Sequence, residues 1–94
     1  MLQMQVHWTT DALEMLAAIC TDLERTSPQY AETVADAVIK RGNLLADSPY
    51  QGRALPEVQF KPVRELFVLS YRLVYYVGST QIEIFAVVHQ AQKR

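Results

Sequence analysis

The spacing of apolar residues changes once along the chain, from a helical period to the alternation of β-strands. Four apolar residues follow one another at spacings of three, four and three: Leu13, Leu16, Cys20 and Leu23. A second helical set of small and apolar residues comes after Pro28: Ala31, Val34, Ala35, Val38, Gly42 and Leu45. Each set marks one face of a helix, and the short connection between them predicts an antiparallel helical hairpin.

Polar residues mark the ends of both predicted helices. Asp11 is the expected N-cap of the first helix, with Glu14 three residues later as in a capping box. Ser27 is expected to cap the second helix, because Pro28 then falls in the first turn, where proline is tolerated. The string Asp47-Ser48-Pro49 is expected to end that helix.

The second half of the chain is rich in β-branched and aromatic residues, which predict three strands. The segment from Arg64 to His89 is expected to form an antiparallel meander, with Gly78-Ser79-Thr80 as the tight turn between its last two strands. A short strand is also expected over residues 3–8, and a loop over residues 50–56. The predicted fold class is α+β, in the order β-α-α-β-β-β, with the helical hairpin packed on one face of an antiparallel sheet.

Alternation along the meander predicts which side chains share a face. A two-residue turn before the last strand places the core residues Leu73 and Tyr75 on one face with four apolar residues of that strand: Ile82, Ile84, Ala86 and Val88. The other face then carries Arg72 together with four residues of the last strand: Glu83, Phe85, Val87 and His89. A three-residue turn would instead bury the charge of Arg72 in the core, which is costly for an unpaired ion.

The face away from the helices supports two interpretations. A guanidinium and an imidazole beside an aromatic ring, as in Arg72, His89 and Phe85, favour an anion or nucleotide site. The alternative is an ion pair between Arg72 and either Glu65 or Glu83, with no role in binding. The sequence leaves both interpretations open.

Length and charge narrow the class of protein. The 94 residues are enough for one domain, residues 1–94, and for one hydrophobic core. The net charge of −1 argues against binding to nucleic acid by bulk electrostatics. Charge is unevenly spread, because residues 1–47 carry three basic and seven acidic side chains, giving −4, while residues 48–94 carry six and three, giving +3.

The cysteine and histidine content argues against disulfides and metal sites. Cys20 is the single cysteine, so no internal disulfide forms, and its place on a helical apolar stripe predicts an inert core thiol. The two histidines and the cysteine lie far apart without ligand spacing, and no glycine-rich phosphate loop is present, so no metal or cofactor is expected. No apolar run suggests a membrane span or a signal peptide, and a cytoplasmic protein is expected.

Ordered strings of residues point to a known family. They comprise Gly52-Arg53 with Pro56-Glu57, then Val63-Arg64-Glu65-Leu66, then Tyr71-Arg72-Leu73-Val74-Tyr75, and finally Ile82 with Val88-His89. With a tryptophan-containing first strand, a helix pair and Ser48-Pro49, this set resembles the RelE/ParE superfamily of toxins from type II toxin–antitoxin systems. The resemblance covers almost the whole chain. It implies a compact toxin held inactive by a small antitoxin, with DNA contacted only through that antitoxin.

Two branches of this superfamily imply different targets. RelE-like members cut mRNA on the ribosome, whereas ParE-like members act on DNA gyrase. Arg72 falls on the motif whose arginine stabilises phosphate charge in the ribonucleases, and His89 stands where some of them use a histidine as general acid or base. The preceding strand, however, has Arg64 and Glu65 in place of the lysines of RelE-like members, and the ending Gln90–Arg94 lacks their tyrosine.

The ParE-like branch, with DNA gyrase as target, is therefore the leading hypothesis. The alternatives are a ribosome-dependent mRNA endoribonuclease, with Arg72 and His89 as catalytic residues, and an inactive homologue that serves as a binding module. Whether the protein is an enzyme thus stays open. Target or anion binding is expected at basic and aromatic residues of the C-terminal half: Arg53, Arg64, Arg72, Phe85, His89, Lys93 and Arg94.

Overall fold

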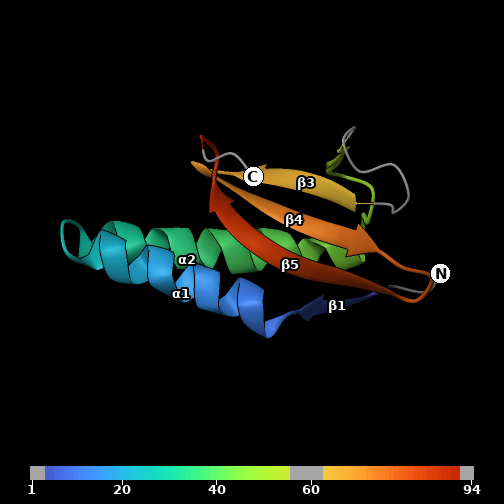
Figure 1. Ribbon diagram of the computed structural model, residues 1–94, viewed down its shortest axis with the longest axis horizontal. Coiled ribbons are helices and arrows are strands. Elements are labelled where there is room, and N and C mark those ends of the chain that lie inside the picture. Colours follow the sequence, from blue (N-terminus) through green and yellow to red (C-terminus); the bar gives the residue numbers. More distant parts are fainter. Residues whose placement is uncertain (1–3, 56–62, 92–94) are drawn as a thin grey trace.

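Two helices pack on one face of a five-stranded mixed sheet in the computed structural model, which describes residues 4–55 and 63–91 (Figure 1). The N-terminal elements are β1 (Gln5–Trp8), α1 (Thr10–Glu24), α2 (Pro28–Asn43) and a 3₁₀ turn, η1 (Leu44–Ala46). The remaining strands are β2 (Arg53–Ala54), β3 (Val63–Val68), β4 (Tyr71–Val77) and β5 (Gln81–His89). The predicted α+β class and the helical hairpin on one face of the sheet are confirmed.

The sheet has the strand order β1-β5-β4-β3-β2 and contains one parallel pair. Strands β3, β4 and β5 form the predicted antiparallel meander, whereas β1 pairs in parallel with the first half of β5. Two residues of the expected loop, Arg53 and Ala54, pair with β3 as an additional short strand. The expectation of a purely antiparallel sheet is therefore wrong at its β1 edge. The direction of β1 is set by where α1 and α2 return the chain, which local sequence does not specify.

The start of α2 is as predicted, whereas α1 has a different cap and α2 ends at Asn43, before the expected Asp47, with η1 between them. Thr9, not Asp11, caps α1, and its hydroxyl oxygen accepts a hydrogen bond of 3.1 Å from the backbone N–H of Ala12. Ser27 caps α2 as predicted, accepting from the N–H of Tyr30 at 3.2 Å, and Pro28 is the first helical residue. Because α1 starts two residues earlier than expected, Asp11 already lies in its first turn.

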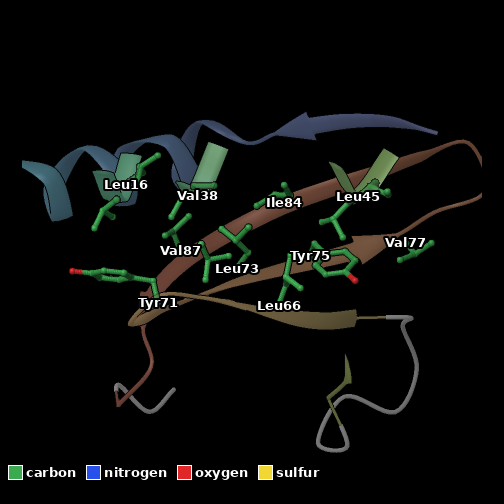
Figure 2. Close-up of a cluster of buried hydrophobic side chains, with 14 residues drawn as sticks. Leu16, Val38, Leu45, Leu66, Tyr71, Leu73, Tyr75, Val77, Ile84 and Val87 are labelled. Carbon is green, nitrogen blue, oxygen red and sulfur yellow. The ribbon is translucent and has the colours of Figure 1, made fainter. Parts of the chain in front are cut away.

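The core lies between the helices and the facing side of β3, β4 and β5 (Figure 2). Helix α2 contributes the predicted positions, with Val34 and Val38 fully buried. In α1 the buried face is centred on Ala12 and Leu16, so Leu13, which is 45% exposed, was wrongly assigned to it. Cys20 is partly buried beside this core, and burial, followed by the charge of Glu24, raises the pKa of its thiol. The thiol therefore stays protonated at neutral pH.

Helix α2 approaches β1 closely at Gly42. A Cβ built on Gly42 would lie 2.4 Å from the Cζ2 atom of Trp8 and 3.1 Å from the Cδ1 atom of Ile84. The Trp8 ring is further fixed by its Nε1–H, which donates to the Oδ1 atom of Asn43 at 3.0 Å. The absence of a side chain at Gly42 therefore allows α2 to pack closely against β1.

Substituting Gly42→Ala is expected to lower the free energy of unfolding by about 1–2 kcal/mol. Overpacking costs about 1–3 kcal/mol, and the higher helical propensity of alanine offsets up to about 1 kcal/mol. Urea denaturation provides the measurement. In a Trp8→Ala background the added methyl group has space, so the same substitution should become stabilising; an unchanged sign would contradict the packing explanation.

Candidate functional site

A β-bulge in β5 determines which side chains share a face at the end of the sheet. Tyr75 pairs with Ile84 and Val74 with Ala86, so Phe85 is the extra residue opposite β4. The two-residue turn is as predicted: the N–H of Gly78 donates to the carbonyl of Gln81 at 2.9 Å, which leaves Ser79 and Thr80 as the turn. Beyond the bulge, however, each residue of β5 faces the side opposite to the one predicted.

The bulge separates Arg72 from His89. Arg72 pairs with Val88 and lies on the face away from the helices, whereas His89 pairs with Tyr71 on the helix side. The imidazole contacts the Tyr71 ring edge-on, with 5.4 Å between ring centroids. The predicted common face for these two residues is therefore wrong. The placement of Ala86 and Val88 under the helices is wrong for the same reason.

Burial confirms this change of face. Val87, predicted to face away from the helices, is buried in the main core. Ala86 instead belongs to a smaller apolar cluster on the helix-free side, with Leu55, Val63 and Val74.

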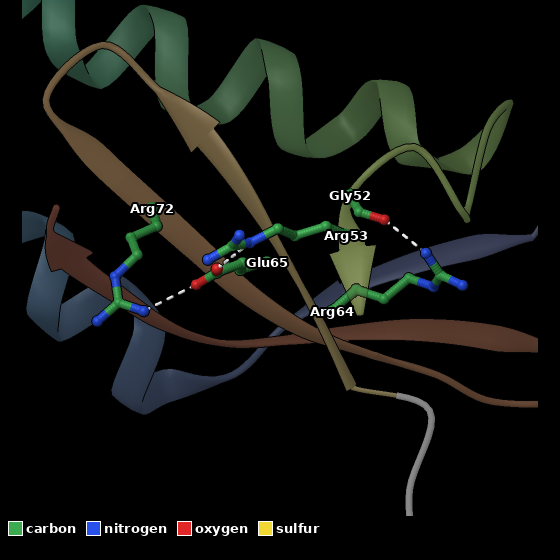
Figure 3. Close-up of polar contacts among 5 residues, drawn as sticks. All are labelled: Gly52, Arg53, Arg64, Glu65 and Arg72. Carbon is green, nitrogen blue, oxygen red and sulfur yellow. Dashed lines mark hydrogen bonds and ion pairs between the residues drawn. The ribbon is translucent and has the colours of Figure 1, made fainter. Parts of the chain in front are cut away.

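Arg72 is held by a buried carboxylate (Figure 3). Its Nη1 atom donates to Oε1 of Glu65 at 2.8 Å, and the Nε atom of Arg53 donates to Oε2 of the same side chain at 2.7 Å. The Glu65 side chain is 1% exposed and that of Arg72 11%, while that of Arg53 is 68% exposed. The sequence alternative of an ion pair between Arg72 and Glu65 is thus confirmed, with Arg53 as a second partner.

The protonation of Glu65 follows from these contacts. Burial raises the pKa of its carboxyl, but the hydrogen bonds and positive charges of Arg72 and Arg53 outweigh burial and hold the pKa below its usual value. Glu65 is consequently ionised at neutral pH. The cluster of Arg53, Glu65 and Arg72 carries one net positive charge.

Arg64 does not take part in the Glu65 cluster but contacts the loop before β2. Its Nη1 atom donates to the carbonyl of Gly52 at 2.6 Å, and its guanidinium carbon lies 4.9 Å from the centroid of the Tyr50 ring. The neighbouring Tyr75 hydroxyl accepts from the N–H of Gly52 at 2.9 Å and donates to the carbonyl of Pro49 at 2.8 Å. Arg64 and Tyr75 together therefore hold the segment from Pro49 to Gly52 against the sheet.

The two remaining described candidates line separate hollows. Phe85 lies beside Glu83, Tyr76 and Val63 on the helix-free face. His89 borders a hollow of about 390 Å³ on the helix side, lined chiefly by residues of α1 and by the ends of β4 and β5: Met15, Ala18, Ile19, Asp22, Leu23, Tyr71, Val87 and Val88. Lys93 and Arg94 lie outside the described residues.

Comparison with known proteins gives one match that decides the family. The sequence profile described as "ParE toxin of type II toxin-antitoxin system, parDE" matches residues 6–94. The chain belongs to the ParE toxin family. A comparison with curated protein sequences gave no significant match.

Solved structures of other toxin–antitoxin systems contain chains with the same fold as this protein. The chromosomal ParDE toxin–antitoxin system from P. aeruginosa contains a chain with a TM-score of 0.78 and 21% identity, with 93% of this chain and 96% of that chain covered. The toxin–antitoxin complex RelBE2 from Mycobacterium tuberculosis gives a TM-score of 0.68 and 23% identity, with 98% and 97% covered. At these identities the likeness establishes the fold.

In this ParE family protein the predicted basic residues do not form one site. Arg53 and Arg72 both form ion pairs with Glu65. Arg64 binds the loop before β2, and His89 lies on the other face of the sheet. Sequence reasoning missed Arg53 as a partner of Glu65 and Tyr75 as the anchor of the loop. The alternation of Arg64 and Glu65 signalled opposite faces, but the partners of each residue come from distant segments.

No metal site or membrane span emerges from the parts of the chain that are described. Within residues 4–55 and 63–91, no three His, Cys, Asp or Glu side chains gather as ligands of a metal ion would. Over the same residues, neither helix combines the length and apolar character needed to cross a bilayer.

Proposed function

We propose that this ParE family toxin inhibits growth by binding DNA gyrase, and that a cognate antitoxin neutralises it. The family match supports a toxin, and the two similar solved structures come from systems named as toxin–antitoxin pairs. The toxin acts through surface contact with gyrase and performs no chemistry of its own.

The separation of Arg72 from His89 carries the preference for a binding mechanism. A ribonuclease that used both residues needs phosphate stabilisation and proton transfer at one scissile bond, within hydrogen-bonding reach of both groups. Here the two side chains lie on opposite faces of the sheet, and Arg72 donates to the buried Glu65 carboxylate. This arrangement favours gyrase binding over the alternative of mRNA cleavage.

Two assays run in parallel test the proposal. Purified toxin is expected to inhibit supercoiling by gyrase at micromolar concentration and to leave mRNA intact in a translating extract. His89→Ala changes an exposed residue, and mRNA is expected to stay intact with this variant as it does with the wild type. Uninhibited gyrase together with codon-positioned mRNA cuts that disappear in Arg72→Ala would establish the ribonuclease instead.

Expression in cells separates both active toxins from an inactive homologue. Growth arrest without an antitoxin, relieved when the antitoxin is co-expressed, is the expected result. Normal growth at the same level of folded protein would contradict both toxin mechanisms and support the inactive homologue that serves as a binding module.

A further inference from the structure

A hollow of about 480 Å³ opens on the helix-free face of the sheet. Its described lining comes from three neighbouring strands: Val63 of β3, Tyr76 of β4, and Glu83 and Phe85 of β5. Val63 pairs with Tyr76 and Tyr76 with Glu83, so these three side chains form one row across the sheet. Phe85 lies on the same face because it is two positions after Glu83 on β5, and as the bulged residue it has no register partner on β4.

The Glu83 carboxylate is the charged group of this hollow. Over residues 4–55 and 63–91 both recorded salt bridges go to Glu65, and the side chain of Glu83 makes no hydrogen bond or ion pair. His7 is the register partner of Glu83 on β1, but its imidazole forms no salt bridge with the carboxylate. A half-buried carboxylate that has no counter-ion among the described residues is suited to a cation supplied by another molecule.

The aromatic walls favour the same sign of charge. The faces of the Tyr76 and Phe85 rings carry the negative part of the ring quadrupole, which attracts cations within about 6 Å. An anion would meet repulsion from Glu83, and a purely apolar group would bury that carboxylate without a partner. The position of Phe85 thus indicates a cation site, opposite in charge to the anion site expected from the sequence.

The protein already uses this chemistry internally. The guanidinium of Arg53 lies 5.6 Å from the centroid of the Phe67 ring while its Nε atom binds Glu65. One arginine thus contacts both the ring of Phe67 and the carboxylate of Glu65. Phe85 with Glu83 presents the same combination, an aromatic ring and a carboxylate, without an arginine from the described residues.

The geometry points to a binding site for an arginine side chain of a partner protein, formed by Tyr76, Glu83 and Phe85. A planar guanidinium stacks on an aromatic ring and forms a forked hydrogen bond with a carboxylate at the same time, which an ammonium group does not. The site is separate from Arg72 and does not depend on gyrase being the target.

Titration of the ¹⁵N-labelled full chain with N-acetyl-arginine amide, followed by NMR, tests the assignment. Saturable shifts are expected at the amides of Tyr76, Glu83 and Phe85, with binding at least about fivefold weaker for the neutral analogue N-acetyl-citrulline amide. Equal shifts with both probes, or no saturation, would overturn the proposal.

Variants link the effect to these side chains. Glu83→Gln is expected to weaken arginine binding about fivefold, whereas Glu32→Gln, an exposed carboxylate on α2, leaves it unchanged. Phe85→Leu removes the ring and should also weaken binding, whereas Tyr76→Phe keeps the ring and should not. Equal affinity in Glu83→Gln and Glu32→Gln contradicts the proposal. Concentration-dependent shifts at the same residues without any probe would identify a second copy of this chain as the donor and overturn the assignment to a different protein.

Discussion

Replacing Glu65 with alanine is expected to lower the free energy of unfolding by about 3–5 kcal/mol. The substitution removes the carboxylate that faces two guanidiniums at 2.7 and 2.8 Å. Arg72 remains buried and charged because arginine does not lose its proton in a protein. A buried ion pair contributes little beyond its own desolvation cost, but removal of one partner exposes that cost in full.

The Arg53 side chain offers the matched control. Arg53→Ala breaks the other half of the same cluster, yet 68% of this side chain is exposed, so a loss of only about 0–1 kcal/mol is expected. Urea denaturation followed by circular dichroism measures both variants. Equal losses for Glu65→Ala and Arg53→Ala would show that burial of the Arg72–Glu65 pair does not determine the stability of this face.

The same carboxylate predicts how stability changes in acid. Its pKa in the folded protein lies below the unfolded reference of 4.5. Its contribution to stability is therefore complete above that reference and is lost as pH falls through the folded pKa. The difference in stability between the wild type and Glu65→Gln should shrink as pH falls through this range, and a constant difference would count against the ionised pair.

Replacing Tyr75 with phenylalanine is expected to lower the free energy of unfolding by about 2–4 kcal/mol. The change removes one oxygen atom and leaves the buried ring in place. That oxygen accepts from the N–H of Gly52 and donates to the carbonyl of Pro49. The Gly52 N–H and the Pro49 carbonyl then lose their hydrogen-bond partner where water has little access. Leaving one buried polar group without a partner costs about 1–3 kcal/mol of stability.

Tyr71 supplies a chemically identical control. Tyr71→Phe removes a hydroxyl that makes no recorded hydrogen bond to the described part of the chain, so its cost should stay below about 0.5 kcal/mol. Hydrogen exchange adds a local measurement, since protection of the Gly52 amide should fall in Tyr75→Phe and persist in Tyr71→Phe. Loss of stability without loss of that protection would assign the effect to packing.

The segment held by Tyr75 precedes β2, which carries Arg53 to Glu65. A Cβ on Gly52 would lie 2.5 Å from the backbone oxygen of Glu65, so this loop and β3 are in direct contact. The hydroxyl of Tyr75 and the guanidinium of Arg64 therefore position the strand that completes the Glu65 cluster. Sequence spacing separates these residues widely, and only their meeting in space shows the connection.

Elements governed by local interactions were predictable. The helical stripe from Ala31 to Leu45, the cap at Ser27 with Pro28, and the turn after Val77 each depend on residues within a few positions of one another. The α+β order followed from those elements, and the resemblance to the RelE/ParE superfamily rested on short strings that the family profile matches as a whole.

The candidate site was predictable only in part, because its geometry depends on register. One additional residue at Phe85 reverses the facing of the rest of β5, and alternation alone carries no signal for such an insertion. His89 consequently lies on the helix side, whereas Phe85 keeps the face that alternation predicted, the same as that of Glu83. The ion pair of Arg72 with Glu65 was one of two sequence alternatives, which the cross-strand packing decided.

The sequence by itself determined the helices, the meander and the family, since periodicity, capping and short strings are properties of neighbouring residues. The tertiary structure alone decided the parallel edge at β1, the bulge at Phe85 and the sharing of Glu65 by Arg53 and Arg72. Each of these depends on free-energy differences between pairings of distant segments, which no local pattern encodes. They place Arg72 in a buried ion pair and His89 on the opposite face of the sheet.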